Sequence, residues 1–199
     1  MTLADLDESA EDAFEPFVSG IERLGATPNQ VSVVSFLVAV TAAGSFYTAT
    51  TAGYVGGSLL VAVSAVLDAV DGQLARRTGK ASPQGDMLDH TLDRYSDLVL
   101  IAGIAGGVGA WDVGFFAVTG VFLTSYMGTQ AQAVGAGRDY GGLLGRADRM
   151  TLIILVGVVQ PFVPLVEGLT ALGWLLVVFG VVGNLTAVQR FRASWNQLS

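Results

Sequence analysis

The sequence predicts an all-α integral membrane protein, and three observations carry that prediction. Hydrophobic residues make up 52% of the chain and charged residues only 14%, whereas soluble proteins contain about 25% charged residues. The mean hydropathy is +0.58. Long stretches without any charge alternate with short charged segments, which is typical of a chain that crosses a membrane several times.

The charge-free stretches predict six transmembrane helices. A spanning helix needs about 20 mostly apolar residues, so the first and longest stretch holds two helices and each of the others holds one. The stretches without Lys, Arg, Asp or Glu are Gly25–Leu67, Leu98–Trp111, Val113–Gly137, Met150–Val166 and Gly168–Gln189. The turns expected on one side of the membrane are Tyr47–Tyr54, Gly109–Asp112 and Pro161–Gly168.

All ten basic residues fall on the same side of the membrane in this arrangement. Cytoplasmic connections are enriched in Lys and Arg, so both termini are expected in the cytoplasm of a multi-pass cell-membrane protein. The opposite turns carry only the acidic residues Asp112 and Glu167. The basic residues are Arg23, Arg76, Arg77, Lys80, Arg94, Arg138, Arg146, Arg149, Arg190 and Arg192.

Residues 1–28 are expected to form an N-terminal cytoplasmic or juxtamembrane segment, and residues 29–199 a single six-helix membrane domain. The first residues are acidic and lack a basic region before an apolar core, so they do not resemble a cleaved signal peptide. Apolar residues with helical spacing predict a short helix that lies on the membrane surface or, as we favour, packs against the bundle. They are Phe14, Phe17, Val18, Ile21 and Leu24.

Four aspartates flank the connection between the second and third predicted spans. Asp68 and Asp71 are three residues apart, and Asp89 and Asp93 are four apart, so each pair projects from one face of a helix. Hard divalent cations such as Mg²⁺ bind carboxylate oxygens, and unpaired acids beside a bilayer are costly. We therefore expect the two faces to oppose each other and to form a metal site at the cytoplasmic membrane edge.

Small residues and an arginine accompany these acids. Gly72 and Ala75 leave a trough in which a phosphate or nucleotide approaches the backbone, and Arg76 offers a guanidinium fork for phosphate oxygens. Gly85 leaves a second gap one turn before Asp89. The combination suits in-line displacement at phosphorus with two cations, or with one acid acting as the base that deprotonates an attacking hydroxyl. A solvated acidic loop is the alternative, but it does not explain the small residues.

Three further residues or segments have simpler interpretations. Ser82 as N-cap and Pro83 at the first position predict the start of the next helix. Thr27-Pro28-Asn29 is expected to cap the first span, and His90 to be a filler or solvent-facing residue.

The chain resembles the CDP-alcohol phosphotransferase family, also called the CDP-alcohol phosphatidyltransferases. It matches the family signature at every fixed position, and the resemblance extends through all six predicted spans. The matching pattern is Asp68-x2-Asp71-Gly72-x2-Ala75-Arg76-x8-Gly85-x3-Asp89-x3-Asp93.

The resemblance implies a six-helix membrane fold, usually homodimeric, that transfers the lipid-bearing phosphoryl group of a CDP-linked lipid to an alcohol and releases CMP. It implies two Mg²⁺ or Mn²⁺ ions, with Asp93 also acting as the base. The metal ligands that it implies are Asp68, Asp71, Asp89 and Asp93, and the residues that contact the cytidine diphosphate are Gly72, Ala75, Arg76 and Gly85.

A second basic group lies on the same side of the membrane as the aspartates. Arg146 and Arg149 precede the fifth span, and Arg190 ends the sixth. Converging guanidiniums favour a phosphorylated acceptor, such as glycerol phosphate or inositol phosphate, because they match phosphate oxygens bidentately. The positive-inside bias explains the same positions without any ligand, and a non-phosphorylated acceptor such as serine is the alternative.

Three segments resemble the branch of the family that makes phosphatidylinositol phosphate, or its archaeal ether-lipid equivalent, from inositol phosphate. They are SYMGTQAQAVGAGRDYGG, GRADRM and AVQRFRASW. That branch has a Lys and an Arg where this chain has Gly128 and Gln130, and an acid where it has Gln132, which keeps other polyol phosphates open. The sequence pI of about 4.4 favours a halophilic archaeal source and hence CDP-archaeol over CDP-diacylglycerol as donor.

Two other classes of protein also use membrane-embedded acids. A divalent-cation carrier would repeat its acids along spans that face a pore, but the remaining acids near spans lie at predicted span ends. A membrane prenyltransferase typically has two separate aspartate-rich motifs, whereas this chain has one composite motif. A net charge of −7 gives no reason to expect a nucleic-acid partner.

Overall fold

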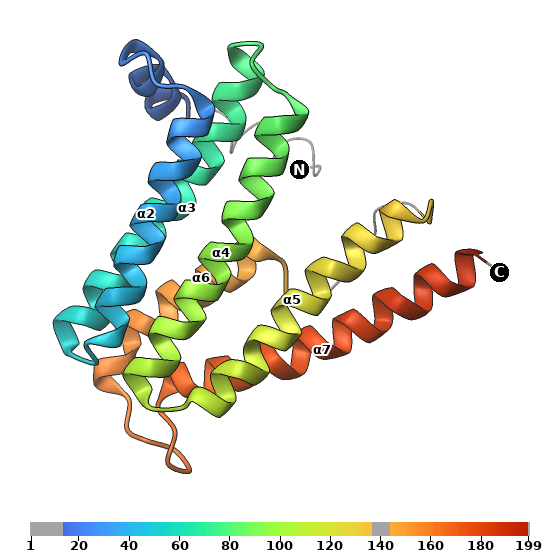
Figure 1. The fold of residues 1–199 in the computed structure, drawn as a ribbon. Coiled ribbons are helices and arrows are strands. Elements are labelled where there is room, and N and C mark those ends of the chain that lie inside the picture. Colours follow the sequence, from blue (N-terminus) through green and yellow to red (C-terminus); the bar gives the residue numbers. More distant parts are fainter. Residues whose placement is uncertain (1–13, 137–143, 199) are drawn as a thin grey trace, which may run out of the picture.

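The computed structural model is all-helical over the residues that it describes, 14–136 and 144–198 (Figure 1). A helical segment at residues 14–23 precedes α2, and a short 3₁₀ helix, η1, follows α6. The elements are α2 (Pro28–Tyr47), α3 (Thr51–Arg77), α4 (Pro83–Val108), α5 (Trp111–Ala133), α6 (Arg146–Val159), η1 (Gln160–Phe162) and α7 (Ala171–Leu198).

The helix starts follow the capping signals in the sequence. Thr27 caps α2 in a capping box with Gln30, so the expected cap at Thr27-Pro28-Asn29 is confirmed. Ser82 accepts a hydrogen bond from the backbone N–H of Gly85 and caps α4, as expected. These side chains satisfy N–H groups that have no partner within the helix.

The expected turns are also confirmed. α2 and α3 are separated by three residues near Tyr47–Tyr54, and α4 ends one residue before Gly109, which adopts a left-handed conformation. The chain between η1 and α7 covers most of Pro161–Gly168. α3 continues to Arg77, so the helix carries Asp68 and Asp71 beyond the apolar stretch, as the sequence predicted.

Among the described residues, three helices are long and apolar enough to cross a membrane: α2, α3 and α7. The first half of α4 carries the acidic motif, and the second half of α5 contains several polar residues. An all-helical fold with three candidate membrane-spanning helices is therefore observed among the described residues, and the six spans stay a prediction.

α6 is shorter than the fifth expected span. It contains 14 residues and ends at Val159, whereas the charge-free stretch continues to Val166. Pro161 and Pro164 explain the difference, because proline lacks the N–H that continues a helix. The buried side chain of Gln160 accepts a hydrogen bond from the backbone N–H of Leu172 at 2.9 Å and so links the end of α6 to the start of α7.

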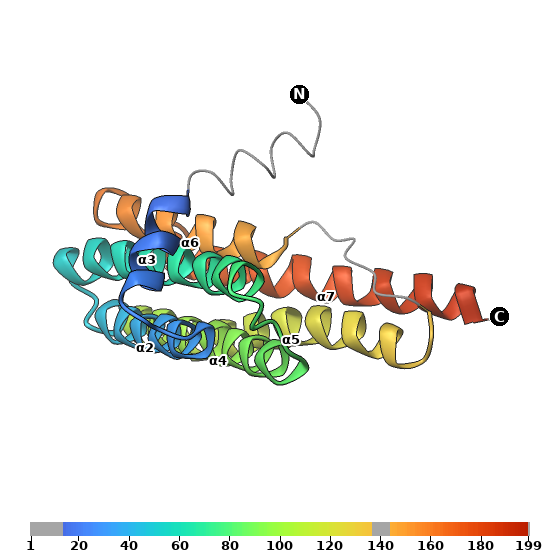
Figure 2. The same cartoon turned by 90° about the horizontal axis from the view of Figure 1, so that it is seen from above.

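The helices form two layers. Seen from above, α3, α6 and α7 lie in one layer and α2, α4 and α5 in the other (Figure 2). α2 packs against both α3 and α4. α5 and α7 pack against each other and extend together to one side of the other helices (Figure 1). The main hydrophobic core joins these groups, and its largest buried side chains include Phe46, Leu100, Ile104, Leu172, Leu176 and Phe179.

Glycines let helix backbones touch at two crossings. A Cβ atom on Gly103 would lie 2.3 Å from the carbonyl oxygen of Ala43, and one on Gly107 would lie 2.2 Å from that of Phe46. Gly183 meets the backbone of α5 in the same way. These contacts are typical of helix packing in lipid, where small residues permit close approach.

Residues 14–23 pack against the ends of α2 and α3, as favoured from the sequence. Val18 is buried with Val31, Val70 and Leu74. Arg77 pairs with two acids of the segment, Glu15 at 2.5 Å and Glu22 at 3.0 Å. The segment therefore covers the face of α3 that carries Val70, Leu74 and Arg77.

We expect Gly103→Ala to destabilise the protein, because the added methyl group would overlap the backbone of α2. Overpacking of this kind costs about 1–3 kcal/mol. Unfolding by denaturing detergent, followed by circular dichroism, measures the change.

Gly44→Ala is the matched control for this substitution. Gly44 also lies within a helix, but no atom lies within 4 Å of the Cβ position, so alanine should stabilise the helix by about 0.5–1 kcal/mol. Equal effects of the two substitutions would contradict the proposed backbone contact between α2 and α4.

Candidate active site

The two aspartate pairs meet at the end of the bundle where α3 ends and α4 begins. Carboxylate oxygens of Asp68, Asp71 and Asp89 all lie within 4.8 Å of one another. Asp89, Asp93 and His90 form a second group with the same spacing. The opposed acidic faces expected from the sequence are therefore present, and we refer to the four aspartates as the acidic group.

Burial makes negative charge costly in the acidic group. Asp71 is only 4% exposed, and its Oδ2 atom has no hydrogen-bond partner among the described residues. Burial raises the pKa of Asp93 to about 8, and the neighbouring Asp68 and Asp89 add to this rise while Arg146 opposes it. Burial and the nearby Asp68 also raise the pKa of Asp89.

A divalent cation fits this set of donors. Several carboxylates converge, one buried oxygen has no partner, and oxygen ligands are those that Mg²⁺, Mn²⁺ and Ca²⁺ prefer. A bound cation would favour the charged form of every carboxylate that contacts it. The geometry thus agrees with divalent-metal use by this chain.

Arg146 projects from the start of α6 into the acidic group. Its guanidinium donates a hydrogen bond to Asp68 and lies 2.9 Å from Asp93. It thereby links α6 to both α3 and α4. The sequence had placed Arg146 only in the basic group, so its contact with two of the four aspartates is a finding of the structure.

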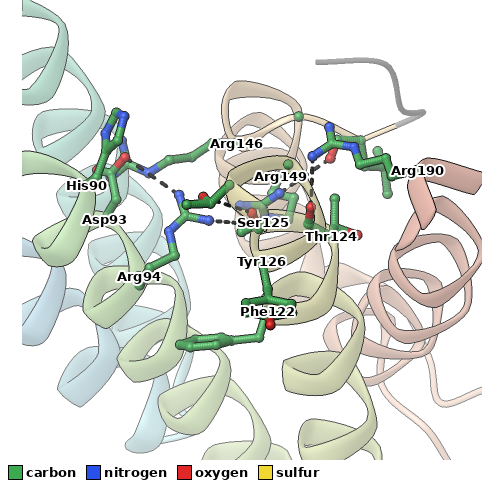
Figure 3. A pocket seen from close by; sticks show the side chains of 14 residues that line it. His90, Asp93, Arg94, Phe122, Thr124, Ser125, Tyr126, Arg146, Arg149 and Arg190 are labelled. Carbon is green, nitrogen blue, oxygen red and sulfur yellow. Dashed lines mark hydrogen bonds and ion pairs between the residues drawn. The ribbon is translucent and has the colours of Figure 1, made fainter. Parts of the chain in front are cut away.

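A cavity of about 480 Å³ adjoins the acidic group (Figure 3). It lies between α4, α5, α6 and α7, and Asp93 contributes to its wall. Arg146, Arg149 and Arg190, which the sequence predicted to converge, all line it. The other lining residues are His90, Arg94, Phe122, Thr124, Ser125, Tyr126, Gly128, Thr129, Leu144 and Gly145.

Arg94 also lines this cavity, a position that the sequence did not predict. Its guanidinium donates a hydrogen bond to Ser125 on α5 and lies 3.7 Å from Asp93 and 3.6 Å from Asp97. Figure 3 shows Arg94 on the side of Asp93 that faces α5. In the sequence, only the position of Arg94 next to Asp93 indicates that it lies near the site.

The residues expected to contact the cytidine diphosphate lie next to the acidic group. Gly72, Ala75 and Arg76 are on α3, and Gly85 is in the first turn of α4. Unlike Gly103, neither Gly72 nor Gly85 meets another helix backbone: the nearest atoms to their Cβ positions belong to side chains. Close helix packing with another backbone therefore does not explain these glycines.

Two other predicted features lie near this region. The side chain of Asn29, next to the α2 cap, lies 3.4 Å from the Cβ position of Gly85. His90 is half-exposed, as expected from the sequence, but it also lies 3.7 Å from Asp86 and from Asp89 and lines the cavity.

One family model and several known proteins match this chain. The family model for CDP-alcohol phosphatidyltransferase matches residues 26–185. An archaetidylinositol phosphate synthase of Pyrococcus horikoshii is 36% identical over 154 residues, which cover 77% of this chain and 80% of that protein. An enzyme of the same name from Methanothermobacter thermautotrophicus is 31% identical over 207 residues, with 98% and 100% covered.

Solved structures of a phosphatidylinositol phosphate synthase from Mycobacterium tuberculosis have a similar fold. The structure with CDP-DAG bound superposes with a TM-score of 0.76 at 26% identity and covers 92% of this chain and 93% of that one. The structure in complex with manganese and citrate gives a TM-score of 0.79 at 26% identity, with 92% and 88% covered.

We expect Asp71→Asn to lower the affinity for Mn²⁺ by at least about tenfold, because it removes one charged ligand from a buried group. Titration of Mn²⁺ into the purified protein, followed by electron paramagnetic resonance, measures this directly. Asp112→Asn, at an exposed site in the first turn of α5, is the control and should bind Mn²⁺ like the unmodified protein. Unchanged affinity in Asp71→Asn would remove this residue from the metal site.

Proposed function

The chain belongs to the CDP-alcohol phosphatidyltransferase family, and from that premise we propose that it transfers an archaetidyl-type group from a CDP-linked lipid to the hydroxyl of a polyol phosphate. The reaction releases CMP and serves phospholipid biosynthesis. One observation carries the proposal: Asp93 belongs to the acidic group and also lines the cavity with converging arginines. It is the point at which a metal-bound donor and a phosphorylated acceptor would meet.

The donor side of the site consists of α3 and the first turns of α4. Gly72, Ala75 and Gly85 leave the backbone accessible to the cytidine diphosphate, and Arg76 offers its guanidinium to the phosphate oxygens. The acidic group would hold two Mg²⁺ or Mn²⁺ ions, which when bound neutralise the pyrophosphate and stabilise the leaving oxygen. The manganese complex of the mycobacterial relative supports this assignment.

The chemical step needs only one proton transfer by the protein. Asp93 accepts the proton of the acceptor hydroxyl, and the resulting oxygen attacks the phosphorus that bears the lipid. A new P–O bond forms to the acceptor while the P–O bond to CMP breaks, and CMP leaves with its electron pair. No covalent intermediate with the enzyme is needed.

The cavity supports a phosphorylated acceptor. Arg94, Arg146, Arg149 and Arg190 line it, and a phosphate provides the negative charge that matches their guanidiniums. Serine or another acceptor without a phosphate would provide less negative charge. Because archaetidylinositol phosphate synthases are among the similar proteins, we propose inositol phosphate as the first acceptor to test and glycerol phosphate as the second.

The arrangement in the membrane is part of the proposal. We propose six spans within residues 29–199, with residues 1–28 as a juxtamembrane segment, both termini in the cytoplasm and the active site on the cytoplasmic side of the cell membrane. The distribution of basic residues supports this orientation. A homodimer is proposed by resemblance to the family.

A direct assay tests the function. Purified protein is incubated with Mg²⁺, CDP-archaeol or CDP-diacylglycerol, and inositol phosphate, glycerol phosphate or serine, and the released CMP is measured. We expect CMP release with a polyol phosphate, with CDP-archaeol preferred as donor, and loss of activity when the metal is chelated. If folded, metal-loaded protein releases no CMP with any acceptor, the proposed function is wrong.

We expect Asp93→Asn to lower kcat at least about a hundredfold, because the amide cannot accept the proton of the acceptor hydroxyl. Binding of the CDP-linked lipid should persist, since the remaining aspartates and the small residues of α3 stay in place. A binding titration with the lipid and the CMP assay together separate the two effects. Substantial activity in this variant would exclude Asp93 as the base.

We expect Arg190→Ala to raise the KM for the polyol phosphate about tenfold and to leave the KM for the CDP-linked lipid unchanged, because one charged contact to the phosphate is lost. Arg192→Ala is the matched control: Arg192 lies two residues further along the same helix, is exposed and does not line the cavity. If both variants changed the two KM values alike, the basic group would not be an acceptor site.

A further inference from the structure

Asp97 is a buried carboxylate that lies outside the family signature. It follows Asp89 and Asp93 at the same four-residue spacing on α4, but it belongs to neither group of possible metal ligands. Its side chain is only 2% exposed. Such a group needs a positive partner, because an unpaired buried charge is strongly destabilising.

Two guanidiniums from different helices meet at one oxygen of Asp97. Arg149 of α6 donates a hydrogen bond to Oδ2 over 2.7 Å, and a terminal nitrogen of Arg94 lies 3.6 Å from the same atom. Arg94 also reaches Ser125 on α5. Asp97 therefore connects three helices through two arginines that both line the cavity.

The arginines of the cavity are held in two different ways. Arg146 contacts Asp68 and Asp93, both in the acidic group. Arg149 pairs with Asp97 instead, and Arg94 is shared between Asp97 and Asp93. Like charges that converge on one cavity repel each other, and Asp97 is a source of opposing charge that the metal site does not use.

We propose that Asp97 is a positioning residue that holds the guanidiniums of Arg94 and Arg149 at the cavity, where they bind the phosphate of the acceptor. The proposal rests on the proposed function for the identity of the ligand. Asp97 does not contact the reacting atoms; it fixes two groups that contact the substrate. Its loss should therefore weaken acceptor binding and leave the donor site intact.

The main test compares Asp97→Asn with the unmodified protein. Asparagine keeps the shape of the side chain and removes its charge, so we expect the KM for the polyol phosphate to rise about tenfold or more, with the KM for the CDP-linked lipid within about twofold. Asp112→Asn, an exposed acid at the start of α5, is the matched control and should change neither value. Equal changes in both KM values, or no change, would overturn the proposal.

A second variant covers the case in which Asp97→Asn does not fold. Asp97→Glu keeps the charge and moves the carboxylate by one methylene group, so it should raise the KM for the acceptor more than the KM for the CDP-linked lipid. Combining Asp97→Asn with Arg94→Gln adds a test of coupling. We expect the double variant to raise the acceptor KM by less than the product of the single effects, and a purely multiplicative result would separate Arg94 from Asp97.

A binding experiment separates this proposal from the proposed function. Inositol phosphate and inorganic phosphate are titrated into the Mg²⁺-loaded protein by calorimetry, without any donor. If the unmodified protein releases no CMP with any acceptor, the proposed function fails, and the titration alone decides the role of Asp97. Weaker phosphate binding in Asp97→Asn or Asp97→Glu would support it, and binding equal to that of the unmodified protein would exclude it.

Discussion

The convergence of four carboxylates at the ends of α3 and α4 is the constraint on which the site depends. Each acid lies at the polar end of a largely apolar helix, so the group is stable only with positive charge beside it. α2 makes this convergence possible: it packs against both α3 and α4 and, through Gly103 and Gly107, contacts the backbone of α4. The two acidic helices are thus held in position mainly by a third helix, which leaves room between their carboxylates for a cation and a pyrophosphate.

The rest of the bundle supplies the other half of the site. α6 contains only 14 residues and is shorter than α2, α3, α4, α5 and α7. Its first turn carries Arg146, which contacts the acidic group, and Arg149, and both arginines line the cavity. α5 and α7 form the far wall, where Arg190 donates a hydrogen bond to the carbonyl oxygen of Thr124 at 2.8 Å. Asp93 lies between the two halves. The carboxylates of α3 and α4 therefore gather at one end of these two helices.

The sequence predicted the elements of this fold well because their signals are local. The N-caps at Thr27 and Ser82, the turns and the spacing within each aspartate pair depend on residues that are near neighbours in the chain. The pairing of Arg149 with Asp97 and the reach of Arg94 to Ser125 depend on how α4, α5 and α6 are arranged, which no local spacing records. Arg94 and Asp93 are adjacent in sequence and lie about 100° apart around the helix, so the four-residue spacing of the aspartates does not indicate that Arg94 lines the same cavity.

The geometry also bears on the acceptor. The resemblance to the inositol phosphate branch implies cations where this chain has Gly128 and Gln130. Only Gly128 lines the cavity, whereas Gln130 is exposed and lies outside its wall. Positive charge at the α5 wall comes instead from α4, because Arg94 donates a hydrogen bond to Ser125, one turn before Gly128 and Thr129. A cavity that is lined by four guanidiniums retains the charge needed to bind a phosphate monoester. The cavity thus keeps positive charge beside Gly128 although α5 itself carries no Lys or Arg.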